Sequence, residues 1–393
     1  MTTQRISIID AIRGMAVLGI LFANIQSWSG YKFVPFETIE GLSLSQYDHY
    51  FLEFHYWCVD GKFYAIFSML FGAGFAIQYM KHRENQDLFL KVYRRRLGFL
   101  LMFGLLHMFI WSGDILTLYA LMALVLVAIR NLPYRSLLPV SLGLLGCFAL
   151  LHLSLLASGW TEPHLESTAH KTYADIDSVS YVKIFTDGSV ADVFVRNLSN
   201  IYWRWADMLP NGRISRILGF FMLGFYLMRS GFFTEKIYQW KFLLVSGVVG
   251  LGLTVYVYQA HTNMYHWGTS VEDVFNKVLM VVAQTSLALT YMCLLAQVYR
   301  HRIGEKILLP LTIIGRMAFT NYLSHTLIGI LIFYGFAGGL YGTFSLTQLY
   351  VMALVIYTTQ VLMSAAWARK HKQGPVEWLW KCLTSKKWSS NLK

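Results

Sequence analysis

The sequence predicts an all-α protein, a polytopic bundle of about ten helices that cross a membrane and leave both chain ends in the cytoplasm. Three observations lead to this prediction. Of the 393 residues, 56% are hydrophobic and only 14% are charged, whereas a soluble domain carries about 25% charged residues. Apolar runs recur along the chain at the length of about 20 residues that a spanning helix needs. Lys and Arg gather in alternate connections between these runs.

Each apolar run predicts one spanning helix. The first run is interrupted near its start by Asp10 and Arg13 and no small-residue cleavage site follows it, so it is not expected to be a cleaved signal peptide. The third and fourth runs are separated by Ser112-Gly113-Asp114, which predicts two short helices joined by a tight outer turn. The predicted spans cover residues 12–29, 61–80, 97–113, 114–130, 137–157, 213–229, 241–260, 273–299, 315–337 and 348–368.

The basic residues orient the bundle. With the N-terminus inside, the inner segments hold 23 of the 33 Lys and Arg and the outer segments hold 8, which agrees with the preference of basic residues for the cytoplasmic side. We therefore expect one transmembrane domain over residues 1–393. It has a polar outer loop at 158–212, whose later part (190–210) predicts a helix in the membrane interface. A basic amphipathic cytoplasmic tail at 369–393 is expected to lie along the inner membrane surface.

Several classes of function find no support in the residue pattern. The net charge of +12 lies in short patches between apolar runs, which argues against a nucleic-acid-binding face. The four cysteines are scattered, and the histidines lack any metal-ligand spacing, so we expect no disulfide and no metal site. The chain has no phosphate-binding loop, no dinucleotide fingerprint and no nucleophile elbow.

Polar side chains inside predicted spans are the functional candidates, because each costs several kcal/mol in hydrocarbon unless it is paired or faces water. Asp10 and Arg13 share one helical face and could pair. Asn24 lies about three turns further along the same span. It either bonds a neighbouring helix or faces a substrate.

His107 and Asp114 form a second polar constellation. A continuous helix would put these two residues on one face, and a turn at Gly113 would fold Asp114 back towards His107. Either geometry lets the carboxylate orient the imidazole as a general base; the alternative is a packing histidine. His55, near the outer end of the second predicted span, is kept in reserve.

Arg13 and Arg316 are expected to make the inner mouth electropositive, as a site for a phosphorylated cytosolic ligand needs. Asn321 follows Arg316 at helical spacing and is assigned to the same site. For Arg94-Arg95-Arg96, anchoring at the cytoplasmic surface is the preferred interpretation.

These segments resemble the YeiB-like family of bacterial inner-membrane proteins. The resemblance lies in the first span and in the stretches KFYAIFSMLFGAGFA, RRRLGFLLMFGLLHMFIWSGDILTLYAL, GRMAFTNYLSHT and QGPVEWLWKCLT. That family is grouped with transmembrane acyltransferases, which include the acyltransferase-3 proteins and heparan-α-glucosaminide N-acetyltransferase. The resemblance implies a ten-helix bundle that takes an acyl group, commonly from cytosolic acetyl-CoA, to an acceptor on the far side of the membrane.

The resemblance also places individual residues. Asp10, Arg13 and Gly14 match the opening Asp-x-x-Arg-Gly pattern, and Asn24 falls where the heparan-acetylating relatives place an active-site Asn. Those relatives carry a catalytic His shortly afterwards, whereas residues 25–40 contain no histidine here. His107 is therefore our substitute, chosen from the residues themselves.

We therefore expect an acyltransferase embedded in the bacterial inner membrane. Acetyl-CoA or another acyl-CoA would be the donor, and an envelope glycan or lipid the acceptor. His107 would be the base oriented by Asp114, and Asn24 would donate a hydrogen bond to the oxyanion. The donor-binding residues would be Arg13, Arg316, Asp10 and Asn321.

The expected partners are the bilayer and the acceptor, and nucleic acid is not expected to bind. The sequence leaves the oligomeric state open, and a homo-oligomer is one possibility. Two alternatives remain. One is a transporter or exporter of a small anionic molecule, because buried His, Asp and Arg also suit proton coupling. The other is a scaffold of envelope assembly in which the polar residues only pack.

Overall fold

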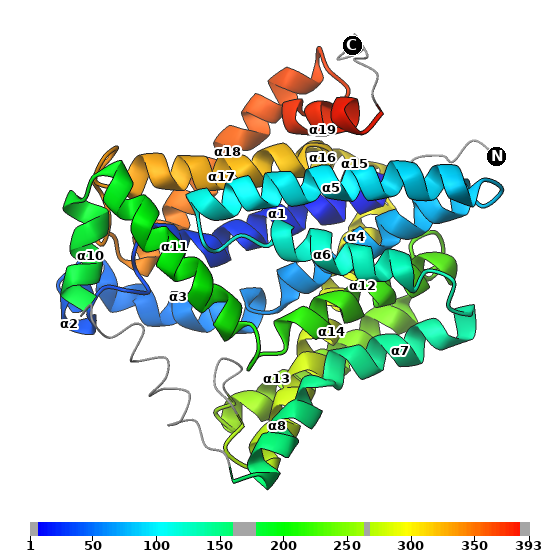
Figure 1. The fold of residues 1–393 in the computed structure, drawn as a ribbon, viewed down its shortest axis with the longest axis horizontal. Helices are drawn as coiled ribbons and strands as arrows, with labels where there is room; N and C mark the ends of the chain where they lie inside the picture. The colour runs from blue at the N-terminus through cyan, green and yellow to red at the C-terminus, as the bar shows by residue number, and fades with distance from the viewer. Residues whose placement is uncertain (1–6, 160–177, 263–267, 386–393) are drawn as a thin grey trace.

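The computed structural model describes residues 7–159, 178–262 and 268–385. All regular secondary structure in these residues is helical. The central helix is α1 (Ser7–Trp28). It packs against α4 (Lys62–Lys81), α16 (Leu309–Arg316), α17 (Ala318–Phe333) and α18 (Leu346–Ala368) (Figure 1).

The other long helices surround this centre. Helices α10 and α11 and the short α2 lie at the end of the bundle away from the N-terminus (Figure 1). The remaining elements are α2 (Phe36–Glu40), η1 (Ser45–Tyr47), α3 (Asp48–Phe54), the π-helical turn η2 (His55–Val59), α5 (Gln86–Ile110), α6 (Leu116–Ala128), α7 (Tyr134–Gly146), α8 (Phe148–Ala157), α10 (Ser178–Asp187), α11 (Val190–Asp207), α12 (Arg213–Arg229), η3 (Lys236–Tyr238), α13 (Trp240–Gln259), α14 (Val271–Tyr299), α15 (Arg302–Ile307) and α19 (Pro375–Ser385).

Every predicted span falls on one or two of these helices, which confirms the all-α class. Five helical segments of the described chain are long and apolar enough to cross a membrane, or six if the bent pair α7–α8 forms one span. The difference from ten has a plain cause. Helices α6, α17 and α12 have only 13, 16 and 17 residues, at or below the shortest length of about 17 that a bilayer requires. Helix α5 begins among the charges of its first turns.

Two predicted spans need correction. The segment 315–337 is not one helix, because α16 ends at Arg316 and α17 starts at Ala318, with a break at Met317. The segment 137–157 is bent by 42° between α7 and α8. The predicted turn at Ser112-Gly113-Asp114 is confirmed, since α5 ends at Ile110 and α6 starts at Leu116.

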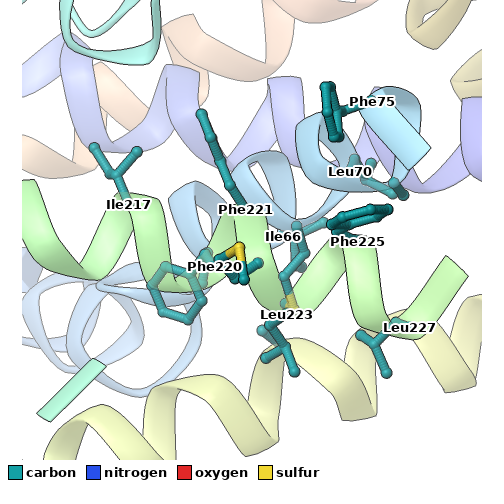
Figure 2. Packing of buried hydrophobic residues seen from close by; sticks show 14 of the residues in the cluster. Ile66, Leu70, Phe75, Ile217, Phe220, Phe221, Leu223, Phe225 and Leu227 are labelled. Atoms are coloured by element: carbon teal, nitrogen blue, oxygen red, sulfur yellow. The ribbon is translucent and has the colours of Figure 1, made fainter. Parts of the chain in front are cut away.

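Helices α4 and α12 cross in close contact within the core. Figure 2 shows Ile66, Leu70 and Phe75 of α4 beside the phenylalanines of α12. A Cβ atom on Gly72 would clash with the backbone carbonyl of Phe221, and one on Gly224 would clash with the carbonyl of Met69. These two backbones therefore touch because glycine stands at both crossing points, as small residues allow between membrane helices.

Replacing Gly72 with alanine is expected to lower the free energy of unfolding by about 1–3 kcal/mol, the usual cost of overpacking a tight core. Gly74→Ala is the matched control on the same helix, because a Cβ atom at Gly74 meets no described atom within 4 Å. Thermal unfolding of the detergent-solubilised protein measures both variants. Equal midpoints of thermal unfolding for the two variants would show that the close α4–α12 contact does not limit the stability of the fold.

Helix α11 has its polar side towards the protein. Arg196, Asn197 and Asn200 are buried, whereas Phe194 and Leu198 are exposed. The Asn197 amide nitrogen donates to the carbonyls at the end of α5, Met108 (3.1 Å) and Phe109 (2.7 Å). The helix predicted over 190–210 is thus confirmed as a helix, and its exposed apolar side is of the kind that an interfacial helix inserts among lipids. Residues 160–177 of the expected outer loop lie outside the described residues.

The C-terminal helix α19 is docked on the bundle. Glu377 accepts hydrogen bonds from the backbone N–H groups of Phe319 (2.8 Å) and Thr320 (3.1 Å), and so caps the first turn of α17. The Trp380 indole donates to the Arg96 carbonyl (2.9 Å), and the Arg96 guanidinium lies 4.1 Å from its ring centre. The expected membrane-surface tail thus has a helix that packs on α5 and α17.

Candidate functional site

Two cavities lie along the central helix. The large cavity, of about 490 Å³, touches Gly19, Asn24 and Ser27 in the C-terminal half of α1. The small cavity, of about 230 Å³, touches Arg13 in its N-terminal half. Arg13 and Asn24 are about 16 Å apart along a helix that rises about 1.5 Å per residue. One face of α1 therefore serves both cavities.

A single layer of side chains separates the two cavities. Both are lined by Phe67, Leu116, Tyr119 and Tyr322, which we call the septum. Tyr119 is fixed within this layer, because its hydroxyl is 2.6 Å from the Ser68 hydroxyl.

Asn24 is placed as the sequence predicts, with its side chain lining the large cavity. It is half-buried, and its amide makes no hydrogen bond to any residue in the described parts of the chain. The interhelical hydrogen bond that was the alternative for Asn24 is therefore not present among these residues. A polar group left without a protein partner on a cavity wall is a group available to a ligand.

His55 also lines the large cavity. Its Nδ1 atom lies 2.5 Å from the Tyr350 hydroxyl of α18 and 3.1 Å from the Gln26 amide nitrogen of α1. Its Nε2 atom has no hydrogen-bond partner within the described residues. The π-helical turn η2 carries His55, and such turns often occur at functional sites.

The role open to His55 depends on the Tyr350 hydroxyl. When Nδ1–H donates to the phenol oxygen, the Gln26 amide can donate to that oxygen (3.4 Å) but not to Nδ1, and Nε2 keeps a lone pair that can accept a proton. When the phenol donates to Nδ1, Nε2 carries the hydrogen and is a donor. An imidazole held at one nitrogen and free at the other is the arrangement that acid–base catalysis needs.

The predicted contact between His107 and Asp114 is present. The His107 Nδ1 atom lies 2.7 Å from the Asp114 carboxylate, and Nε2 lies 2.9 Å from the Thr326 hydroxyl. Asp114 also accepts from the backbone N–H groups of Leu116 (3.0 Å) and Thr117 (2.8 Å), so it caps α6. Both ring nitrogens of His107 are thus engaged.

His107 and Asp114 are buried and line neither cavity. The turn that they hold does line the large cavity, through Trp111, Ser112 and Gly113. The general-base role assigned to His107 stays a prediction, and the geometry gives this pair a direct part in fixing the cavity wall.

The small cavity has a strongly basic lining. Arg13 pairs with Asp10 (2.9 Å) and donates to the Gly315 carbonyl (3.2 Å), which confirms the predicted pair. Arg316 and Arg96 line the same cavity. The expected grouping of Arg13 with Arg316 is confirmed, whereas Arg96 was assigned only to anchoring.

Asn321 is not part of this lining. Its amide nitrogen donates to the Met317 carbonyl (2.9 Å) and to the Ser364 hydroxyl (3.3 Å), within the contact between α17 and α18. The small cavity instead gains Glu377 and Trp380 from α19. Because their position depends on docking of the C-terminal helix, the local sequence held no sign of it.

Lys32 extends into the large cavity from the connection between α1 and α2. Lys32 is exposed on the open side of this cavity, and charged side chains of the lining lie near its ammonium group. Burial lowers the pKa of Lys32 below its ordinary value of 10.5; Asp60 and Asp207 oppose this shift, whereas Arg204 and Arg213 add to it. The lining of the large cavity thus combines charged side chains with aromatic side chains.

An all-α bundle with five or six described helical segments of spanning length and apolar composition is typical of a multi-pass membrane protein, and two cavities lie along its central helix. Residues 227–387 match the family described as "Protein of unknown function (DUF418)". This match covers the C-terminal part of the chain, whereas the likeness of the chain to curated relatives extends over nearly its full length.

The relatives are bacterial. The chain is 28% identical to "Uncharacterized protein YxaH" of Bacillus subtilis, over 99% of this chain and 96% of the relative. It is also 28% identical to "Uncharacterized protein YeiB" of Escherichia coli, over 96% and 95% of the two chains. The resemblance to YeiB expected from the sequence is therefore confirmed. No solved structure matches the chain.

Proposed function

We propose that the protein is a membrane-embedded acyltransferase. It takes an acyl group, which we expect to be acetyl, from a cytosolic acyl-CoA in the small cavity to an envelope glycan or lipid in the large cavity. One observation carries the proposal. A cavity lined by three arginines and a second cavity lined by Asn24 and His55 lie along one helix and share four lining side chains. The Asn24 amide and the Nε2 atom of His55 have no hydrogen-bond partner within the described residues.

The small cavity suits the phosphorylated part of such a donor. Arg13, Arg96 and Arg316 line it, and arginine binds phosphate oxygens through paired N–H donors. The nearest acid in the lining, Glu377, is committed to capping α17. The Trp380 ring beside Arg96 adds a flat apolar surface on which a planar base can stack.

The acyl end has to pass the septum. Phe67 and Leu116 present apolar surface on both sides of it, which suits a thioester and its alkyl arm better than a charged group. Movement of the Tyr322 ring would bring the thioester carbonyl to the cavity side on which Asn24 lies. The phosphates would stay behind with the arginines, because their transfer into the septum is costly.

In the proposed reaction, Nε2 of His55 removes the proton from the acceptor hydroxyl or amine. The acceptor oxygen or nitrogen attacks the thioester carbonyl, and the Asn24 amide donates to the oxygen on which negative charge develops. The carbon–sulfur bond breaks, and the His55 imidazolium returns its proton to the thiolate. Atoms and charge balance without a metal or a redox partner.

His107 and Asp114 take a supporting part in this proposal. They hold the turn from Trp111 to Gly113, and that turn forms part of the wall against which the acceptor would lie. His55 replaces His107 as the base because His55 lines the cavity and its Nε2 atom has no hydrogen-bond partner within the described residues.

We further propose ten crossings with both ends inside, which places the small cavity on the cytoplasmic side. A fluorescent protein fused after Lys393 is expected to fluoresce, because it would remain in the cytoplasm. Alkaline phosphatase is expected to be active when fused after Ser158 and inactive when fused after Lys393. The reverse pattern would place the arginines outside, away from any CoA.

The proposal is tested with the full-length protein in liposomes of bacterial envelope lipids, supplied with acetyl-CoA labelled in its acetyl group. We expect label in a lipid or glycan fraction after extraction, and none with heat-inactivated protein. Release of free acetate alone, or no label in either fraction, would contradict acyl transfer.

A transporter of a small anionic molecule is the second candidate. The same two cavities with a thin septum also fit a path in which a solute passes from one side to the other. Passage of an anion across the liposome membrane without covalent change, together with no labelled product, would favour this function.

A further inference from the structure

The large cavity contains two cations that form no ion pair with a described residue, although acids line the same cavity. Lys32, Arg204 and Arg213 line it, together with the acids Asp60 and Asp207. Arg204 is paired with Asp207 (3.4 Å). Lys32 and Arg213 form no side-chain hydrogen bond or ion pair with a residue of the described ranges.

A third donor lies beside them. The Arg213 guanidinium is 5.4 Å from the centre of the Tyr64 ring. The Tyr64 hydroxyl is buried and makes no hydrogen bond within the described chain. An ammonium, a guanidinium and a phenol thus line one cavity, and none of the three side chains makes a hydrogen bond within the described residues.

This arrangement suits an anion with several acceptor oxygens, because the three cations of the lining outnumber its two acids and the donors lack protein acceptors. A carboxylate offers two oxygens in one plane and could be held by Arg213 alone. A tetrahedral phosphate presents oxygens in several directions, and so can accept from a guanidinium, an ammonium and a phenol together.

We propose that the large cavity binds a phosphate ester through Lys32, Arg213 and Tyr64. Resting on the proposed function, this makes the acyl acceptor a phosphate-bearing molecule. The phosphate ester could be a lipid headgroup or a soluble phosphorylated compound, and the aromatic walls formed by Trp111, Tyr181 and Trp203 suit the remainder of either.

Binding is measured without any acyl donor, on the full chain in a maltoside detergent, which has no phosphate. The readout is tryptophan fluorescence, because Trp111 and Trp203 line the cavity. Glycerol 3-phosphate is compared with glycerol, and dihexanoyl-phosphatidylglycerol is compared with dihexanoylglycerol.

We expect saturable binding of a phosphorylated probe and none of its partner without phosphate. Saturation by glycerol 3-phosphate identifies a soluble phosphate ester, and saturation by the lipid alone identifies a headgroup. Lys32→Gln and Arg213→Gln are each expected to raise the dissociation constant about 10-fold to 100-fold. Lys306→Gln, which removes an exposed cation from α15 outside both cavities, is the control.

The pH dependence of probe binding shows whether the positive charge of Lys32 is needed. The lowered pKa of Lys32 is set by burial and by the facing groups Asp60, Asp207, Arg204 and Arg213. A bound anion favours the charged ammonium, so affinity is full below the pKa of free Lys32 and falls as the pH rises through it. Lys32→Arg is expected to keep its affinity at alkaline pH, since arginine stays charged.

Failure of both phosphorylated probes to bind, or binding that the double variant Lys32→Gln/Arg213→Gln leaves unchanged, would overturn the phosphate site. Because these titrations contain no acyl-CoA, they separate the two proposals. Binding of a phosphorylated probe without any acyl transfer would contradict only the proposed acyltransferase activity. Acyl transfer to an acceptor that lacks phosphate would contradict only the proposed phosphate-bearing acceptor.

Discussion

Replacing His55 with glutamine is expected to lower the rate of acyl transfer about 100-fold to 10,000-fold, the range that a general base contributes. Glutamine can still bond Tyr350 but offers no basic nitrogen to the cavity. The Michaelis constant for acyl-CoA should change little, because the arginines of the small cavity lie on the other side of the septum. Turnover with labelled acetyl-CoA in liposomes measures both quantities.

Two further variants make this result specific. His301→Gln changes an exposed histidine beside α15 and is expected to leave the rate unchanged. His107→Gln breaks the bonds to Asp114 and Thr326, so it is expected to lower the unfolding temperature while the folded fraction keeps its rate within a few-fold. A collapse of the rate in folded His107→Gln, with a near-normal rate in His55→Gln, would restore His107 as the base.

Asn24→Ala is expected to lower the rate about 100-fold to 1,000-fold, the cost of removing one oxyanion donor. The loss should appear in kcat and in kcat/KM alike, because the amide bonds charge that exists only in the transition state. The fold should tolerate the change, since the Asn24 amide makes no hydrogen bond to a described residue.

Asn131→Ala is the matched control for this variant, because it removes an exposed asparagine far from both cavities. If Asn24→Ala instead raised the Michaelis constant for the acceptor and left kcat intact, Asn24 would be a binding residue, and the oxyanion assignment would be wrong.

Much of the fold follows from the sequence because hydrocarbon leaves a membrane chain few choices. A run of apolar residues must be a helix that satisfies its own backbone, so each predicted span coincides with one or two helices. Helix α6 shows the limit of this reasoning. Its 13 residues continue an apolar run, and composition does not distinguish a short helix buried in protein from one that reaches across the bilayer.

The candidate site was predictable where its parts lie close in sequence. Asp10 with Arg13, and His107 with Asp114, are pairs within two turns or one connection, and both contacts are present. His55 was undervalued because its orientation comes from Tyr350, 295 residues further along the chain. Trp380 was missed for a similar reason, since only docking of α19 brings it to the small cavity.

The central claim is that an acyl group passes through the septum from one side of the membrane to the other. Sealed inside-out membrane vesicles test it most directly, because their outer surface is the cytoplasmic face. With acetyl-labelled acetyl-CoA added outside, we expect covalent label on an acceptor in the lumen or the inner-facing leaflet with the native protein, and almost none with His55→Gln. Labelled acceptor confined to the outer face, or equal labelling by both proteins, would contradict the account.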